Sequence, residues 1–306
     1  MTTTLTPTEA PPQAIAAVDP SSAVAPSVPQ DAPVKRSTPI LAAVRRVAAT
    51  VSSGVWKSAA ILAFLALWEL GPIYLASPST RVFLPPLHEV LLAWSKLFEA
   101  GTIQGHIAAS LTRSVAGFGA ALVAGVSLGL LIAWYGRLNA VLNPLLELFR
   151  NTAALALLPV FTLLLGIGEE SKISIVAYAA FFPVLLNTIA GVKTVDPLLI
   201  RAARSLGLNS FQLFQKVILP SAVPTIFTGI RMAGTASILV LIAAEMVGAK
   251  AGLGYLIVNA QSSFLIPDMY AGILTVSLLG LGVNFLLVAL ERHFSRWRTA
   301  VGADAS

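Results

Sequence analysis

The segment Asp196-Pro-Leu-Leu-Ile-Arg-Ala-Ala-Arg-Ser-Leu-Gly207, followed nine residues later by Val217-Ile-Leu-Pro220, is a polar interruption in an otherwise apolar chain. Asp196 suits the N-cap of a helix because its carboxylate accepts hydrogen bonds from free backbone amides, and Pro197 suits the first helical position. Gly207 permits the left-handed conformation that ends such a helix. The pattern predicts a short helix between Asp196 and Gly207.

A second short helix is expected over residues 211–217, capped by Asn209 or Ser210 and separated by Pro220 from the apolar segment that follows. The two helices would meet at a fixed bend. Their apolar side chains are more than so short a loop usually leaves in water; they are Leu198, Leu199, Leu206, Phe211, Leu213 and Phe214. We interpret some of them as a docking surface for another protein. The alternative is that they pack on the chain's own membrane domain.

The spacing resembles the EAA signature of permease subunits in binding-protein-dependent ABC importers, Glu-Ala-Ala-x3-Gly-x9-Ile-x-Leu-Pro. The matching positions hold Ala202, Ala203, Gly207, Leu219 and Pro220. Arg201 stands where the family has Glu, and Val217 stands where it has Ile. The resemblance implies that this segment, including Arg201, couples the chain to a separate ATPase. It does not imply the salt bridges that the family Glu makes.

Further short strings resemble the nitrate, sulfonate and taurine group of these permeases, over about residues 55–298. They are Phe83-Leu-Pro-Pro, Leu155-Ala-Leu-Leu-Pro159, Gly166-Ile-Gly168, Phe181-Phe-Pro183-Val-Leu-Leu-Asn187-Thr, Ala244-Glu245-Met and Gly252-Leu-Gly254-Tyr255. The resemblance implies a type-1 ABC importer permease fold and a small anionic substrate such as an aliphatic sulfonate, taurine or nitrate. It also implies three partners: a second permease copy in a homodimer, two ATPase subunits, and an extracytoplasmic solute-binding protein.

Composition independently indicates a membrane protein: 56% of residues are hydrophobic, 11% are charged, and the mean hydropathy is +0.82. A soluble chain of 306 residues could not hide that much apolar surface. The expected fold class is all-α and integral to the membrane, with lipid as its surroundings. The net charge of +6 does not indicate nucleic-acid binding, because the basic residues fall in short loops at the ends of apolar segments.

Neither catalysis nor a metal site is expected. The chain has no cysteine, and its three histidines, His88, His106 and His293, are too scattered for a set of metal ligands. It has no Gly-x4-Gly-Lys-Ser/Thr phosphate loop and no convergent catalytic set. We therefore expect no enzyme activity and no cofactor bound by this chain, with ATP used by a partner.

Hydropathy predicts about six transmembrane helices, since a span needs roughly 20 apolar residues. They fall at residues 58–76, 107–134, 141–166, 171–191, 224–246 and 269–290. Residues 87–98 have apolar side chains at helical spacing, which favours a helix in the outer interface or, equally, a surface helix packed on a loop. The expected divisions are a disordered cytoplasmic tail (1–50), the first span with the interfacial helix (55–105), the permease core (106–291) and a cytoplasmic C-terminal tail (292–306).

Basic residues are distributed asymmetrically between the two sides of this topology. With the N-terminus inside, most of them are cytoplasmic, whereas Arg81, Lys96, Lys172 and Lys250 lie outside. The positive-inside rule favours this orientation in a bacterial inner membrane, with both termini cytoplasmic. Residues 196–220 then face the cytoplasm, within reach of an ATPase.

Small residues recur every four positions in the second span, at Gly117, Ala121, Gly125 and Gly129. Such a stripe lets another helix approach closely. We favour packing within the chain, and a dimer seam is the alternative.

Three arginines lie in apolar sequence, and each would cost about 2.5–3.5 kcal/mol at a bilayer centre on insertion scales. Arg113 and Arg150 face either an anion pathway or protein, and both interpretations stay open. For Arg231 we favour snorkelling to the cytoplasmic surface. Asn151, Asn187 and Thr188 are further candidates for the pathway, although such groups also bond between helices. Pro159 and Pro183 are expected to bend their helices, around a gate or as static kinks.

Residues 248–254 resemble an outward loop of the family, on the face that receives the binding protein, and Glu245 either orients this loop or simply ends its helix. The leading hypothesis is the permease subunit of an ATP-driven importer. The alternative is an ATPase-independent secondary transporter or channel, which often has inverted repeats or acidic residues deep in the membrane. No clear repeat is visible here, and the acidic residues lie mostly at span ends.

Overall fold

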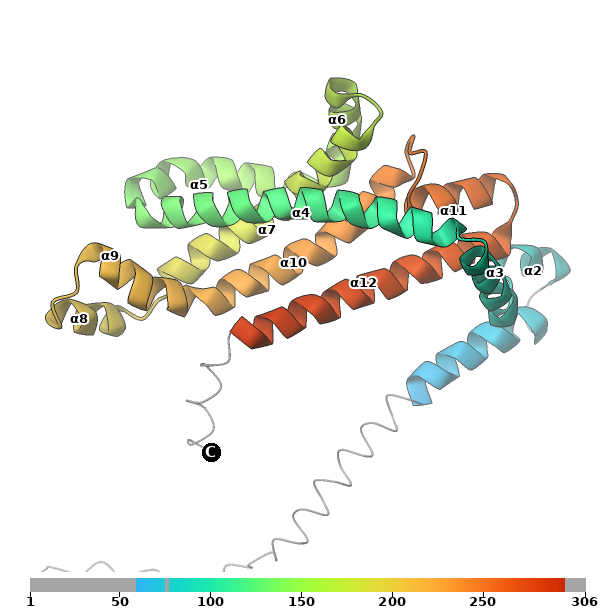
Figure 1. The fold of residues 1–306 in the computed structure, drawn as a ribbon, viewed down its shortest axis with the longest axis horizontal. Coiled ribbons are helices and arrows are strands. Elements are labelled where there is room, and N and C mark those ends of the chain that lie inside the picture. The colour runs from blue at the N-terminus through green and yellow to red at the C-terminus, as the bar shows by residue number, and fades with distance from the viewer. Residues whose placement is uncertain (1–58, 75–76, 295–306) are drawn as a thin grey trace, which may run out of the picture. The chain divides into compact units, whose positions relative to one another are not determined.

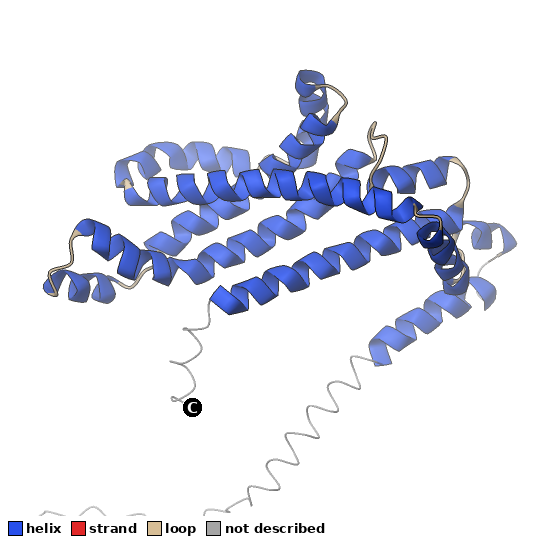
Figure 2. Ribbon diagram, in the orientation of Figure 1, coloured by secondary structure: helices blue, strands red, loops and turns tan. Residues whose placement is uncertain are grey.

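The computed structural model describes residues 59–74 and 77–294, which form helices joined by short loops (Figures 1 and 2). A first helix, Ala59–Tyr74, is followed by α2 (Pro78–Phe83), α3 (Leu87–Glu99), α4 (Thr102–Trp134), α5 (Gly136–Arg150), η1 (Ala154–Leu157), α6 (Leu158–Leu165), α7 (Glu169–Lys193), α8 (Pro197–Ser205), α9 (Ser210–Leu213), η2 (Phe214–Ile218), α10 (Leu219–Glu245), α11 (Leu253–Ser262) and α12 (Ile266–Phe294). The predicted N-terminal tail and residues 295–306 lie outside the described residues.

The prediction of an all-helical membrane protein is confirmed. Within the described residues, four helices are long and apolar enough to cross a bilayer singly: α4, α7, α12, and the unbroken helix Ser210–Glu245 that contains α9, η2 and α10. A bent pair of helices brings the number to five if it counts as one span, and Ala59–Tyr74 is a shorter apolar helix.

The prediction of one continuous span over residues 141–166 is wrong. The helices Gly136–Arg150 and Ala154–Leu165 meet at an angle of 84°. Side chains at the break bond the last carbonyls of α5, with Asn151 Nδ2 donating to Glu147 O (2.9 Å) and Thr152 Oγ1 donating to Leu148 O (3.2 Å). These bonds satisfy groups that a continuing helix would have paired, so the helix ends there.

The bend predicted at Pro159 does not lie at that residue, whereas the bend predicted at Pro183 stays a prediction. Pro159 occupies the first turn of α6, where a missing N–H costs nothing, and the chain has already bent before it. Pro183 lies inside α7, which runs unbroken from Glu169 to Lys193.

Helices α4, α7 and α10 pack together as the centre of the bundle (Figure 1). The small residues of α4 face α7: Gly117 lies against Ile173 and Val176, and Gly125 lies against Val184. A side chain at either glycine would overlap its neighbour, so these glycines set the distance between the helices. All three helices contribute to one buried cluster, Ala121, Ala180, Val184 and Ala233.

Two groups of short elements cover opposite ends of this bundle (Figure 1). At one end α8 and α9 connect α7 to α10, and Phe214 packs on Trp134 at the C-terminal end of α4, with ring centroids 5.1 Å apart. At the other end lie α3 and α11. We refer to these as the α8–α9 end and the α3–α11 end.

Helix α3 packs on a long helix rather than on a loop. Its buried Val90 and Ala93 contact Ala271 of α12, and Trp94 Nε1 donates to Thr275 Oγ1 on the same helix (3.1 Å). Glu69 fixes the start of α3 by accepting from the backbone N–H of His88 (3.0 Å) and pairing with its Nδ1 (2.7 Å). These contacts tie the helix Ala59–Tyr74 to α3.

We predict that Gly117→Ala lowers the stability of the chain, because a Cβ at this position would lie 2.6 Å from Ile173 O and 2.8 Å from Val176 Cβ. The expected loss is about 1–3 kcal/mol, as for other overpacked cores, measured as a lower thermal midpoint in detergent. Gly119→Ala is the matched control, because nothing lies within 4 Å of its Cβ position. Equal midpoints for the two variants would contradict the packing described here.

Candidate functional site

The α8–α9 end carries two short helices whose ends are fixed by local hydrogen bonds. Asp196 Oδ1 accepts from the backbone N–H of Leu198 (2.8 Å) and caps α8, as predicted. The helix ends in a Schellman motif, with Leu208 N–H donating to Ala203 O (3.2 Å) and Gly207 N–H donating to Arg204 O (2.9 Å). Gly207 has a φ of +78°, in the left-handed region that favours glycine.

Asn209, rather than Ser210, caps the second helix. Its Oδ1 accepts from Gln212 N–H (2.8 Å), and Gln212 Oε1 accepts from Asn209 N–H (3.2 Å), which completes a capping box. The predicted separation of this helix from the next at Pro220 is wrong. A π-helical turn joins them, in which Leu219 N–H bonds Phe214 O, and Pro220 lies in the first turn of α10, where its missing N–H is tolerated.

The predicted apolar residues of this segment divide into two groups. Leu213 is buried with Val195, Ala203 and Ile218 in a small core, and Phe214 is half-buried beside it. Four others are exposed, from Leu199 at 50% to Leu206 at 80%. We call this exposed set, Leu198, Leu199, Leu206 and Phe211 together with Arg201 and Arg204, the coupling surface. Of the other signature positions, Ala202 is exposed, whereas Leu219 and Pro220 are half-buried.

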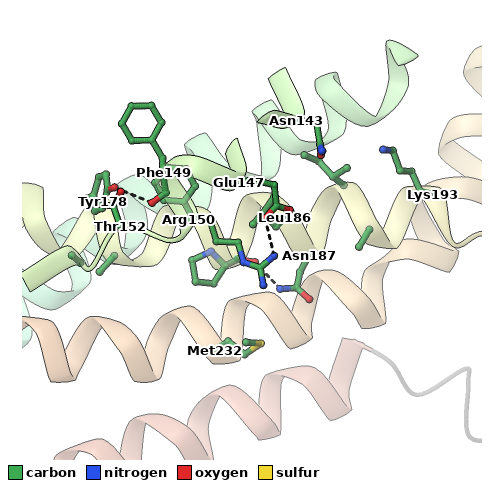
Figure 3. A pocket seen from close by; sticks show the side chains of 16 residues that line it. Asn143, Glu147, Phe149, Arg150, Thr152, Tyr178, Leu186, Asn187, Lys193 and Met232 are labelled. Carbon is green, nitrogen blue, oxygen red and sulfur yellow. Dashed lines mark hydrogen bonds and ion pairs between the residues drawn. The ribbon is translucent and has the colours of Figure 1, made fainter. Parts of the chain in front are cut away.

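A cavity of about 550 Å³ opens beside α5 and α7 (Figure 3). Its polar lining includes Asn143, Glu147, Arg150, Thr152, Tyr178, Asn187 and Lys193. Arg150 and Glu147 are both about half-exposed, and Arg150 Nη1 lies 3.6 Å from Glu147 Oε2. Figure 3 shows the side chains of Arg150, Glu147 and Asn187 close together, with that of Lys193 apart from them. The cavity thus offers two cations, one carboxylate and several neutral polar groups.

Of the residues predicted for the pathway, Arg150 and Asn187 line the cavity, whereas Asn151, Thr188 and Arg113 do not. Asn151 is exposed and bonds the last turn of α5. Thr188 is fully buried, donates to Val184 O (2.7 Å), and lies against Gly129. These bonds within single helices account for both polar side chains.

Arg231 forms an ion pair between two long helices, and its snorkelling to the cytoplasmic surface stays a prediction. Its Nη1 donates to Glu291 Oε2 on α12 (3.0 Å), which joins α10 to α12 in the half of the bundle near α8 and α9.

Arg113 lies in a buried network near the α3–α11 end. It bonds Glu169 with Nε and Nη2, the latter at 2.6 Å from Glu169 Oε1, and its Nη1 donates to Glu245 Oε1 (2.7 Å). The side chain of Arg113 is 5% exposed and that of Glu245 is 0% exposed. Protein carboxylates therefore hold its guanidinium. Of the two interpretations that the sequence left open for Arg113, an anion pathway or contact with protein, the structure supports contact with protein.

The sequence interpretation missed several residues of both sites. Lys193 is one of the basic residues that the predicted topology places in the cytoplasm, and it lines the cavity. Glu147 was not selected, although a carboxylate three residues before Arg150 in an apolar stretch predicts an ion pair on one helix face. Glu169 and Ser110 could not have been paired with Arg113 and Glu245 from spacing alone, because their contacts span 56 to 135 residues.

Comparison with known proteins gives a consistent assignment. Residues 122–299 match the family described as "Binding-protein-dependent transport system inner membrane component". The chain is 37% identical to the taurine transport system permease protein TauC of Escherichia coli (strain K12) over 239 residues, which cover 76% of this chain and 86% of TauC. It is 33% identical to the putative aliphatic sulfonates transport permease protein SsuC of Bacillus subtilis (strain 168), covering 77% and 85% of the two chains.

Two further similarities extend the comparison. The bicarbonate transport system permease protein CmpB of Synechococcus elongatus is 32% identical over 248 residues, which cover 78% of this chain and 88% of CmpB. Among solved structures, a chain of the MetNI methionine ABC transporter in an inward-facing conformation superposes with a TM-score of 0.54 at 19% identity, covering 63% of this chain and 95% of that chain.

The helical bundle and these matches define a multi-pass inner membrane transport subunit that is not itself an enzyme. The chain belongs to the family of inner membrane components of binding-protein-dependent transport systems, and it is an ABC transporter permease subunit. The predicted family resemblance is confirmed.

Proposed function

We propose that this permease subunit moves a small oxyanion inward through the cavity beside α5 and α7, driven by an ATPase bound to the coupling surface. The observation that carries the proposal is the pair of cations, Arg150 and Lys193, in that cavity. The cavity extends to Lys193, the last residue of α7, and therefore to the end of α7 that connects to α8. A passing anion would meet positive charge along this route.

The neutral groups of the cavity suit an oxyanion better than a cation. Asn143 and Asn187 carry amide N–H donors; Asn187 donates one of its two to Pro183 O (2.8 Å), which leaves the other. The Thr152 hydroxyl donates to Leu148 O, and Glu147 is paired with Arg150. Taurine and aliphatic sulfonates carry a sulfonate, and bicarbonate is an oxyanion as well, so the substrates named for TauC, SsuC and CmpB share this chemistry. We extend that substrate class, which includes nitrate, to this chain.

The coupling surface has the character of a docking site. Its exposed leucines and Phe211 are apolar, and Arg201 and Arg204 on α8 are exposed beside them. Asp196, the acidic residue of the segment, is engaged in capping α8. An ATPase groove with apolar and acidic residues would complement this surface, with two ATPase subunits serving two permease copies.

The orientation follows from the same assignment. The α8–α9 end is cytoplasmic in this proposal, and the α3–α11 end faces an extracytoplasmic solute-binding protein. Two copies of the chain would enclose the path, each contributing its cavity. ATP-driven closure of the ATPases would then move the coupling surfaces and switch the cavity between the two sides of the membrane.

We predict that Phe211→Asp lowers the amount of ATPase that co-purifies with the tagged chain by about tenfold or more, since a charge in an apolar contact costs over 1.4 kcal/mol. The folded chain should tolerate the change because Phe211 is 71% exposed. Phe264→Asp, 75% exposed in the loop between α11 and α12, is the matched control and should leave ATPase recovery unchanged. Equal recovery with both variants would reject the coupling surface.

We also predict that Arg150→Gln lowers the maximal rate of ATP-driven anion uptake by about tenfold in proteoliposomes. The variant removes a cation from the path, and a tenfold loss corresponds to about 1.4 kcal/mol of lost attraction for the anion. Arg150→Lys should retain more activity. Arg137→Gln lies on the same helix but outside the cavity lining, so uptake should be unaffected. Unimpaired uptake with Arg150→Gln would contradict the proposed path, and uptake without ATP would favour a secondary transporter.

A further inference from the structure

Glu245 is the last residue of α10, and its buried carboxylate collects hydrogen bonds from three directions. It accepts from Ser110 Oγ on α4 (2.8 Å), from Arg113 Nη1 on α4 (2.7 Å), and from the backbone N–H of Gly254 (3.0 Å). A carboxylate with no exposed surface needs these hydrogen bonds and the ion pair with Arg113, since an unpaired buried charge is strongly destabilising. The carboxylate thus joins two long helices to the segment that follows α10.

The same two side chains of α4, together with His106, hold the backbone of that segment residue by residue. Arg113 Nη1 donates to Ala251 O (2.7 Å), His106 Nδ1 accepts from Gly252 N–H (3.0 Å), and Ser110 Oγ accepts from Leu253 N–H (2.9 Å). We call residues 251–254, the last two of which begin α11 (Leu253–Ser262), the anchored loop. Every residue of it makes at least one backbone hydrogen bond to a buried or half-buried side chain of α4 or α10.

Two glycines let the anchored loop lie directly on the end of α10. A Cβ at Gly252 would overlap the Glu245 carboxylate, and a Cβ at Gly254 would overlap Ile242 O. Gly252 also has a φ of +121°, which side-chain-bearing residues rarely adopt. The loop therefore fits the carboxylate closely rather than passing near it.

Glu245 is also one end of a single continuous element. The helix Ser210–Glu245 contains 36 residues and has no break between α9 and α10. At 1.5 Å per residue it is about 54 Å long. Phe211, on the coupling surface, belongs to its first turn, and Glu245 belongs to its last. One continuous helix, which includes the π-helical turn η2 and Pro224, thus links the proposed ATPase contact to the anchored loop.

We propose that Glu245 and Arg113 are positioning residues that couple the solute-binding protein, bound at the α3–α11 end, to the ATPase at the α8–α9 end. Through them the anchored loop moves with the helix Ser210–Glu245, so docking of the binding protein biases the position of the coupling surface. This inference rests on the proposed function, and it adds a route by which the binding protein stimulates ATP hydrolysis. Rigid elements joined by hydrogen-bond networks are the physical means of such coupling.

The chain contains its own matched control. Glu169 also bonds Arg113, but it lies at the start of α7, its side chain is 64% exposed, and within the described residues its carboxylate bonds Arg113 rather than the anchored loop. Glu245→Gln and Glu169→Gln therefore remove the same charge from the same arginine. They differ in whether the carboxylate also holds the loop.

The first experiment measures the order of the loop. Because the chain contains no cysteine, Lys250→Cys, next to the anchored loop, accepts a single nitroxide spin label. In the assembled transporter in lipid nanodiscs we expect an immobilised spectrum for the parent and for Glu169→Gln. Glu245→Gln should give a spectrum with a larger mobile component, because one anchor of the loop is weakened. Identical spectra for all three would overturn the proposal.

The second experiment measures coupling in proteoliposomes, as the ratio of ATP hydrolysis with a saturating liganded binding protein to hydrolysis without it. Glu245→Gln should lower this ratio at least about fivefold, the lower end of typical coupling between two sites. Glu169→Gln should keep the parental ratio. An equal loss in both variants would show that the charge on Arg113, and not the anchoring of the loop, carries the effect, and would overturn the proposal.

A milder variant covers the case in which Glu245→Gln does not assemble. Ser110→Ala removes the hydroxyl that joins Glu245 to Leu253 N–H but leaves the ion pair in place. Like Glu245→Gln, it should raise the mobility of the anchored loop and lower the stimulation ratio. If the parent transporter shows no stimulation by the binding protein, the proposed function itself fails. If the parent is stimulated and Ser110→Ala matches it in both readouts, only the positioning role fails.

Discussion

A lipid layer is as apolar as a leucine side chain, so helices within it gain little from apolar contact alone and depend on close packing and interhelical hydrogen bonds. In this permease that packing is the contact of α4 with α7 and of α7 with α10. Gly117, Gly125 and Gly129 bring α4 onto α7, and Gly229 brings α10 onto Asn187 and Pro183 of α7. The other elements of the described chain are placed by this three-helix unit.

The close packing of these helices also explains how charged groups are tolerated inside an apolar bundle. Arg113 meets Glu169 from α7 and Glu245 from α10 only because the three helix backbones are close at that level. Further along, Arg231 meets Glu291 of α12. These pairs tie helices together, whereas Arg150 stays about half-exposed beside the cavity with Glu147. The contrast separates arginines that join helices from one whose guanidinium stays exposed beside the cavity.

Much of this could be predicted from sequence because the signals were local. Asp196, Asn209 and Gly207 act through hydrogen bonds or backbone angles within a few residues, and each does what its type predicts. The break after Arg150 and the continuity across Pro220 were missed, because side-chain bonds to α5 and a π-turn decided them rather than hydropathy. The network around Arg113 joins residues more than 130 positions apart, which one sequence cannot pair.

We propose that the helix Ser210–Glu245 and its packed neighbours move as one body between the ATPase and the outer face. The most direct test is pulsed electron paramagnetic resonance on the cysteine-free chain, labelled at Gln215→Cys and Lys250→Cys and diluted with unlabelled copies. Between nucleotide-free and ATP-trapped transporter, the distance between the two labels of one chain should stay constant. In a second, undiluted sample labelled at Lys250→Cys alone, the distance between the labels of the two copies should change. A shift within one chain of about 5 Å or more, roughly one helical turn, would contradict the account.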